Sequence, residues 1–362
     1  MMVSRNLKDT FGGHGHPYKQ PDLKSFRELP DSFKWAVDRD DGIKTASAEQ
    51  VPEINLLEDN AVEKIGEACK SWGAFQVTNH GVSPCLLAKM DKLCRRLFTL
   101  PIHQKLKAAR HPDGVSGYGV ARISSFFSKH MWSEGFTIFG PPSDHFRKLW
   151  PRGFAKYCAL VEEYDEEMKI LSGKLMRMML SALGVSLDDN TKWPKPADHC
   201  AAMQLNYYPS CPEPDQAMGL AAHTDSTLFT VLYQSNTTGL QVFTDRTGWI
   251  TVPPVTGGLV VNVGDLLHML SNGVYKSALH RARVNRTQHR VSVAFLLGPP
   301  SDQRIAPLPQ VVSPTHPPLY RPVTWNEYLS AKAKYFNKAL LSVRVCAANE
   351  SGQVDVSSVQ VG

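Results

Sequence analysis

Apolar residues recur at helical spacing through the first half of the chain. The stripes over residues 61–72 and 86–100 predict two helices, and a longer stripe over residues 154–183 predicts a third. Gly73 and Pro101 directly follow the first two stripes, and both residue types are common helix stops. We expect the long third helix to support a sheet built from later parts of the chain.

From about residue 200 the pattern changes to short β-type segments that are separated by turn clusters. The predicted strands are 202–208, 221–233, 240–244, 249–252, 259–263, 278–284 and 290–297, preceded by two early segments at 51–56 and 74–79. Short strands at this spacing predict an antiparallel sandwich or jelly roll. Residues 325–341 return to a helical pattern, so the predicted fold is mixed α and β, with a jelly-roll core and surrounding helices.

Composition divides the chain into four regions. We expect a polar N-terminal arm over residues 1–50, a mainly helical region over 51–195, a β-rich core over 196–305, and a C-terminal helix and tail over 306–362. The Pro-containing stretch Trp193-Pro194-Lys195-Pro196 marks the change from helix to strand. We expect the helical and β-rich parts to share one hydrophobic core.

Bulk properties exclude several classes of protein. The 362 residues are 42% hydrophobic and 20% charged, which is typical of a soluble globular chain. The net charge is +6, but Lys and Arg are scattered, so we expect no nucleic-acid partner. No apolar run reaches membrane length, and the first 20 residues are polar, so we expect neither a membrane span nor a secretory leader. The seven Cys form no Cys-x-x-Cys pair. We therefore expect a cytoplasmic monomer with no membrane partner.

Candidate chemistry begins in residues 220–232, which we interpret as one strand. Residues two apart in a strand share a face, so His223 and Asp225 are expected to project together and to offer two neighbouring positions to a divalent metal. A His-x-Asp triplet is a weak signal among thirteen His, and a second copy at residues 111–113 contains Pro112 and predicts a surface loop. From the triplet alone, a buried hydrogen-bonded pair is an equal alternative.

A third ligand would come from a later strand, and His280 in the alternating segment 277–284 is the candidate. His268 is a rival, but its segment is mostly apolar and predicts a packed side chain. His289 is a second rival at the edge of a turn, where we expect it to be solvated. Two His and one carboxylate with the other positions open are typical of non-haem Fe(II) oxygenases.

Two polar faces lie near these residues in the predicted sheet. Arg290 and Ser292 share a face of an otherwise apolar strand, where a guanidinium is costly without a partner and matches a carboxylate in a bidentate fork. They predict a receptor for a small dicarboxylate, and the alternative is a surface Arg or an internal ion pair. Asn206 and Tyr208 form a second polar face that can contact the same ligand, or can be an ordinary strand edge.

Taken together, these motifs resemble the plant iron(II)- and 2-oxoglutarate-dependent dioxygenases. The resemblance runs from about residue 51 to 335 and rests on His-Thr-Asp at 223–225, His-Arg at 280–281, Arg-x-Ser at 290–292 and Asn-Tyr-Tyr-Pro-x-Cys at 206–211. It implies a double-stranded β-helix fold. It also implies Fe(II) and ascorbate as cofactors and 2-oxoglutarate as a co-substrate. The resemblance implies that His223, Asp225 and His280 bind Fe(II). It implies that Arg290 and Ser292 bind the far carboxylate of 2-oxoglutarate. Tyr208 and Asn206 would contact the same co-substrate.

A narrower resemblance covers residues 122–138 and 146–151, which are similar to the gibberellin 3-beta-dioxygenases. It implies O2-dependent 3-beta-hydroxylation of a gibberellin precursor, an apolar skeleton that carries a carboxylate. Such a ligand needs aromatic walls and a cationic anchor. The candidate walls are Phe126, Phe127, Trp132 and Phe136, and the candidate anchors are Arg122, Lys129 and Arg147.

Two alternatives to a gibberellin substrate are kept open by the sequence. The same chemistry could act on another diterpenoid or on a flavonoid, because only the segment 122–151 carries the narrower resemblance. A non-catalytic jelly-roll binding protein with a structural metal is the other alternative. Closed structural zinc sites usually take four protein ligands, often Cys, and the three candidates here include none.

Overall fold

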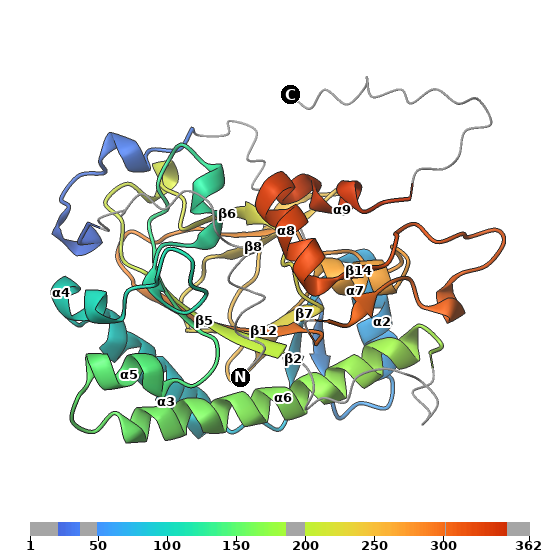
Figure 1. Ribbon diagram of the computed structural model, residues 1–362, viewed down its shortest axis with the longest axis horizontal. Helices are drawn as coiled ribbons and strands as arrows, with labels where there is room; N and C mark the ends of the chain where they lie inside the picture. Colours follow the sequence, from blue (N-terminus) through green and yellow to red (C-terminus); the bar gives the residue numbers. More distant parts are fainter. Residues whose placement is uncertain (1–20, 37–48, 186–199, 301, 346–362) are drawn as a thin grey trace.

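The computed structural model of the chain describes residues 21–36, 49–185, 200–300 and 302–345 (Figure 1). Most of the predicted N-terminal arm and the predicted boundary near residues 195–200 lie outside these described residues.

The three early helices form where the apolar stripes predict them. They are α2 (Ala61–Ser71), α3 (Pro84–Phe98) and α6 (Ala155–Ala182), and α2 and α3 both pack against α6. The other α-helices within the described residues are α4 (Ile102–Lys105), α5 (Ser143–Leu149), α7 (Asp265–Leu270), α8 (Trp325–Tyr335) and α9 (Ala339–Ser342). In the described part of the chain, no helix combines the length and the apolar character needed to cross a membrane.

Short 3-10 turns connect these elements. They are η1 (Leu23–Ser25), η2 (Asp31–Phe33), η3 (Leu106–Ala108), η4 (Arg122–Phe126), η6 (Pro214–Gln216), η7 (Pro309–Val311) and η8 (Phe336–Lys338). The predicted helix 325–341 is interrupted by η8, because Phe336 adopts φ +49° and ends α8. At the other end, Thr324 and Glu327 form a capping box that fixes the first turn of α8.

The larger sheet has eight strands in the order β1-β2-β10-β7-β12-β5-β4-β3. Their bounds are β1 (Glu53–Asn55), β2 (Ala74–Thr78), β10 (Leu259–Val263), β7 (Phe229–Gln234), β12 (Arg290–Gly298), β5 (Cys200–Tyr208), β4 (Glu134–Ile138) and β3 (Gly117–Gly119). Except for the parallel pair β1–β2, neighbouring strands are antiparallel.

The smaller sheet has the order β6-β11-β8-β9, and the two strands β13 (Arg304–Ile305) and β14 (Val323–Thr324) form a separate ribbon. The four strands are β6 (Leu220–His223), β11 (His280–Ala282), β8 (Leu240–Thr244) and β9 (Gly248–Thr251). The prediction of a single strand over 220–232 is therefore wrong. β6 and β7 belong to different sheets, and the chain crosses from one sheet to the other over residues 224–228.

The two faces of the larger sheet are buried against different partners. One face carries residues such as Val231, Val293 and Leu205, which pack into a large core with α2, α3 and α6. The opposite face includes Leu232 and Ala294, and packs against Leu240, Val242 and Ala278 of the smaller sheet and the segment leading into it. In Figure 1 the long helix α6 runs beneath the sheet, while α8 lies near β6 and β8. The predicted jelly-roll core with a supporting helix is confirmed.

Candidate active site

The structure brings the three predicted metal ligands together at one end of the smaller sheet. His223 is the last residue of β6 and lies directly opposite His280, the first residue of β11, in an antiparallel pair. Asp225 lies in the crossing segment just beyond β6. Its Oδ1 is 3.6 Å from Nε2 of His223 and 3.9 Å from Nε2 of His280. The ligand atoms of all three residues lie within 4.8 Å of one another.

Hydrogen bonds orient each of these side chains toward the shared centre. Nδ1 of His223 donates to the Ala221 carbonyl at 2.8 Å, and Nδ1 of His280 donates to the Ala278 carbonyl at 2.9 Å. These bonds leave each Nε2 unprotonated and available to a metal. The Thr230 hydroxyl donates to Oδ2 of Asp225 at 2.6 Å, which leaves Oδ1 facing the two imidazoles.

Electrostatics favour the protonation states that a metal requires. Burial, followed by repulsion from His280, lowers the pKa of His223 to about 4, so the imidazole is neutral at pH 7. Burial would raise the pKa of Asp225, but His280, His223 and the Thr230 hydroxyl outweigh it and the net shift is downward. A neutral His223 imidazole and a charged Asp225 carboxylate therefore face one point together with the His280 ring.

The donor set fits Fe(II). Adjacent ligands at right angles around a metal with bonds of about 2.1 Å are about 3 Å apart, so the observed separations need only a small contraction. All three donors are nitrogen or oxygen, and a mixed imidazole and carboxylate set with open positions suits ferrous iron. The three side chains are almost fully buried, and Asp225 is 8% exposed.

A buried carboxylate outside the ligand set ties both ligand segments to the C-terminal helix. The Asp265 backbone N–H donates to the Asp225 carbonyl at 2.8 Å, and the side chain of Asp265 is fully buried. Four side chains donate to its carboxylate: Ser277 at 2.7 Å, Tyr328 at 2.7 Å, Lys332 at 2.7 Å and Thr224 at 3.2 Å. Thr224 lies between two ligands and Ser277 just precedes the segment that orients His280. Sequence reasoning missed this role, although a lone acid in the apolar segment 263–267 is a detectable signal.

Arg290 and Ser292 lie at the start of β12, on the face of the larger sheet that points to the smaller one. Arg290 is 2% exposed, and its Nη2 donates to Oε1 of Gln234 at 3.2 Å. Its Nε is buried without a hydrogen-bond partner, and no ion pair among the described residues includes it. Burial lowers the pKa of Arg290. A desolvated guanidinium with an unused donor fits an anionic ligand such as a carboxylate.

Tyr208 and Asn206 occupy the same face, paired across the sheet with Arg290 and Ser292 respectively. The Arg290 guanidinium lies 5.1 Å from the Tyr208 ring centre. Burial raises the pKa of Tyr208, and hydrogen bonding from Ser292 and Arg290 opposes that shift. Nδ2 of Asn206 donates to the Ser292 hydroxyl at 3.4 Å. The structure thus brings together all four residues predicted to contact the co-substrate.

The candidate wall segment lies against β6, close to the ligands. Phe127 and Ile123 pack around a cluster that includes Ala221, two residues before His223. Phe126, 38% exposed, stacks on Phe336 with ring centres 4.5 Å apart, and Phe127 meets Phe336 edge-on at 5.5 Å. The first turn after α8 therefore covers the same aromatic residues that precede β4.

Trp132 and Phe136 are corrections to the predicted walls. Both side chains have no exposed surface, so neither borders a space open to a ligand. Phe136 pairs with Leu205 on the helix-facing side of the sheet and contacts Phe146. Trp132 packs edge-on to Phe33 of the N-terminal segment at 5.3 Å. An aromatic-rich sequence cannot distinguish core rings from wall rings, because both are large and apolar.

The rival histidines lie elsewhere and have other partners. In α7, Nδ1 of His268 contacts the Tyr275 carbonyl at 2.6 Å and its Nε2 contacts the Tyr320 hydroxyl at 2.8 Å, so both nitrogens are used. His289 is exposed and accepts from the Ser210 N–H. The second triplet, residues 111–113, is an exposed turn.

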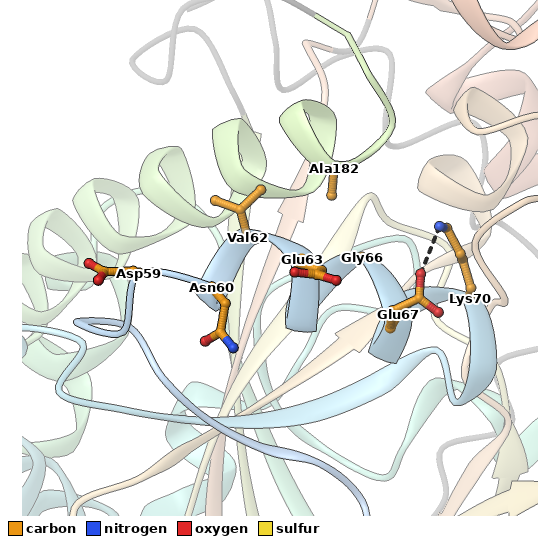
Figure 2. A pocket seen from close by; sticks show the side chains of 8 residues that line it. All are labelled: Asp59, Asn60, Val62, Glu63, Gly66, Glu67, Lys70 and Ala182. Carbon is orange, nitrogen blue, oxygen red and sulfur yellow. Dashed lines mark hydrogen bonds and ion pairs between the residues drawn. The ribbon is translucent and has the colours of Figure 1, made fainter.

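A surface hollow of about 550 Å³ lies between α2 and the end of α6 (Figure 2). Asp59, Asn60, Glu63 and Glu67 line it, and Lys70 donates to Glu67 at 2.9 Å. None of its lining residues is a candidate ligand. Its acids are solvated side chains of an exposed helix face, so the hollow contributes nothing to the chemistry described above.

Comparison with known proteins gives a consistent family assignment. Residues 199–299 match the model of the 2OG-Fe(II) oxygenase superfamily, and residues 45–153 match that of the non-haem dioxygenase in morphine synthesis N-terminal region. The chain is 57% identical to gibberellin 3-beta-dioxygenase 1 of Arabidopsis thaliana over 93% of this chain and 98% of that protein. It is 55% identical to gibberellin 3-beta-dioxygenase 1 of Pisum sativum over 95% and 96% of the two chains.

Solved structures point the same way. A crystal structure of JOX2 in complex with 2OG, Fe and JA is 32% identical and superposes with a TM-score of 0.77, covering 92% of this chain and 100% of that one. The rice dioxygenase for auxin oxidation is 26% identical, with a TM-score of 0.67 and coverage of 82% and 100%.

Proposed function

The chain belongs to the 2OG-Fe(II) oxygenase superfamily and, within it, to the gibberellin 3-beta-dioxygenase family, and from that premise we propose that it converts gibberellin precursors to their 3-beta-hydroxylated products. The reaction uses O2 and 2-oxoglutarate. The observation that carries the proposal is a buried His223–Asp225–His280 centre together with a buried Arg290 that has no acidic partner among the described residues.

His223, Asp225 and His280 would hold the iron through Nε2, Oδ1 and Nε2. When bound with 2-oxoglutarate, Fe(II) supplies the oxidising chemistry that inserts an oxygen atom into a C–H bond. Arg290 and Ser292 would bind the far carboxylate of 2-oxoglutarate, because a bidentate guanidinium and a hydroxyl donor match that group. Tyr208 and Asn206 would set its orientation from the neighbouring strand.

The protein must also orient the substrate and exclude water from the reacting carbon. Phe127 and Ile123 border the cluster around Ala221, so they are suited to form the wall next to the iron ligands. Phe336 covers the wall from the C-terminal side. Burial of the metal centre keeps its environment dry and strengthens the interactions that hold the ligands.

The test is product analysis with purified protein, Fe(II), ascorbate, 2-oxoglutarate and a 3-deoxy gibberellin. We expect a 3-beta-hydroxylated product and one succinate per product. Ascorbate is included as a reductant that keeps the iron ferrous. His223→Ala should abolish turnover, whereas His111→Ala, in the exposed second triplet, should retain it.

Two outcomes would contradict the proposal. Turnover that survives His223→Ala would exclude the assigned metal centre. A panel that yields hydroxylation of a flavonoid or another diterpenoid, but of no gibberellin, would reject the substrate while leaving the enzyme class intact.

A further inference from the structure

Arg110 is a half-buried cation with few partners among the described residues. It follows η3, and its backbone N–H donates to the Tyr118 carbonyl at 2.8 Å. The guanidinium makes one long hydrogen bond, from Nη2 to the Thr137 hydroxyl at 3.4 Å, and Nε is buried without a partner. No ion pair among the described residues includes Arg110. Burial lowers its pKa to about 10.

The guanidinium lies over the same sheet face as the 2-oxoglutarate residues. Gly119, Gly135 and Asn206 are register partners across β3, β4 and β5, and the first two present no side chain. A Cβ added to Gly119 would lie 3.7 Å from Nη2 of Arg110, and one added to Gly135 would lie 2.8 Å from Nε2 of Gln204. The two glycines therefore leave room for the Arg110 and Gln204 head groups on the inner face.

A chain of hydrogen bonds connects Arg110 to the co-substrate residues. The Thr137 hydroxyl donates to Oε1 of Gln204 at 2.6 Å, and Nε2 of Gln204 donates to Oδ1 of Asn206 at 3.1 Å. Asn206 then donates to Ser292. The side-chain amides of Gln204 and Asn206 lie between Arg110 and Arg290 in this chain of hydrogen bonds. The sheet face toward the smaller sheet therefore offers two separate guanidinium groups.

Arg122 adds a second positive charge beside Arg110. It opens η4, which carries Ile123 and leads directly to Phe127, and its Nη2 donates to the Gly114 carbonyl at 3.3 Å. Burial, with repulsion from Arg110, lowers its pKa to about 9. The two guanidinium groups therefore place two positive charges close together, which a bound anion would stabilise.

We propose that Arg110, together with Arg122, binds the carboxylate of the substrate, in a subsite on the inner sheet face distinct from the Arg290–Ser292 receptor. This inference rests on the proposed function and assigns its substrate anchor. Lys129 and Arg147 are poorer anchors: Lys129 is bonded to the Asp31 carbonyl at an exposed site, and Arg147 stacks on Phe154. Arg110 was absent from the sequence-based candidates, because an Arg in a polar loop gives no sign of burial.

The experiment compares wild-type protein with Arg110→Met, using a gibberellin acid and its methyl ester. Binding is measured by calorimetry with 2-oxoglutarate present and O2 excluded, so that it is independent of turnover. We expect wild type to prefer the acid, and Arg110→Met to bind the acid about 10- to 100-fold more weakly with the ester unchanged, as for loss of a charge-assisted hydrogen bond. Arg147→Met serves as the matched control and should keep the acid preference.

Each outcome decides the proposal. Because Arg110 has no carboxylate partner, Arg110→Met should keep the melting temperature and the affinity for 2-oxoglutarate of wild type. A wild-type protein that binds acid and ester alike, or an Arg110→Met variant that keeps the acid preference, overturns the subsite. If wild type prefers the acid and Arg110→Met loses that preference, the subsite stands even when no 3-beta-hydroxylated product forms, and only the proposed reaction fails.

Discussion

Lys332 on α8 donates a hydrogen bond of 2.7 Å to Asp265, a carboxylate with no exposed surface whose backbone N–H holds the Asp225 carbonyl. Lys332 also donates to the Thr224 hydroxyl at 2.6 Å. Helix α8, which follows the jelly roll in sequence, is therefore held by the charged Lys332 side chain to the segment between His223 and Asp225. Two histidines and one aspartate keep their relative positions because this buried pair fixes the backbone next to them.

Breaking the Lys332–Asp265 pair should be costly. Lys332→Met leaves a buried carboxylate without its counter-charge and should lower the free energy of unfolding by about 3–5 kcal/mol. Asp265→Asn should have a similar effect, and the double variant should lose less than the sum of the two. Denaturant unfolding of wild type, the two single variants and the double variant measures this double-mutant cycle. Lys334→Met, on the exposed side of α8, is the control. Strictly additive losses would show that the two side chains do not interact.

Thr230→Val removes the hydrogen bond to Oδ2 of Asp225 and keeps the shape of the side chain. The Asp225 carboxylate is then free to rotate away from the imidazoles, so Fe(II) affinity should fall about 10- to 100-fold. Titration of the metal-free protein with Fe(II) under anaerobic conditions measures this. Thr315→Val, at an exposed site, should leave the affinity unchanged, and an equal effect at both positions would contradict the orienting role.

Arg290→Met should separate co-substrate binding from stability. Loss of the guanidinium should raise the KM for 2-oxoglutarate about 10- to 100-fold, as for a charge-assisted pair with a carboxylate. The melting temperature should not fall, because the variant removes a desolvated charge that has no acidic partner. Arg304→Met, which is exposed, is the control for both measurements. An unchanged KM would assign 2-oxoglutarate binding to other residues.

Phe136 and Phe127 should respond in opposite ways to truncation. Phe136→Ala opens a cavity in the helix-facing core and should cost about 3–5 kcal/mol of stability. Phe127→Ala removes a partly exposed ring beside the ligands, and should raise the KM for the gibberellin substrate with a smaller loss of stability. Unfolding curves and steady-state kinetics on both variants distinguish core from wall. A large stability loss at Phe127 with no change in KM would remove it from the pocket.

His268 should make the metal-free protein sensitive to acid. Burial lowers its pKa below the ordinary value of about 6.5, so the unfolded chain binds an extra proton as the pH falls. Its stabilising contribution is full above about pH 6.5 and is lost as the pH drops toward the lowered folded-state pKa. Unfolding free energies measured at several pH values should decline less steeply in His268→Gln than in wild type. Equal slopes would contradict the assignment of a neutral, doubly bonded imidazole.

Much of the fold was predictable because local patterns dominate it. The stripe over residues 154–183 became α6, and 240–244 and 259–263 became strands β8 and β10 with the predicted bounds. Segment 220–232 was wrong because alternation reports which residues can face a core but not which of two sheets they join. His223 and Asp225 still meet, since the crossing segment turns the carboxylate back toward the imidazole.

The part of the candidate site that could be predicted consists of residues in short sequence motifs with fixed spacing. His223, Asp225, His280 and Arg290 belong to local motifs, so the pattern of the chain exposes them. Asp265 and Lys332 bind each other across 67 residues of sequence, and nothing near them in sequence indicates that contact. Trp132 and Phe136 were misassigned for the same reason, because burial depends on contacts with segments that lie far away along the chain.

The dependence of the ligand segments on Lys332 and of the aromatic wall on Phe336 has a genetic consequence. A stop codon or frameshift after the end of β12 at Gly298 and before residue 325 would spare every candidate iron ligand and yet delete both supports. Loss-of-function alleles should therefore also occur downstream of β12, where a scan restricted to the iron-binding motifs would score the gene as intact.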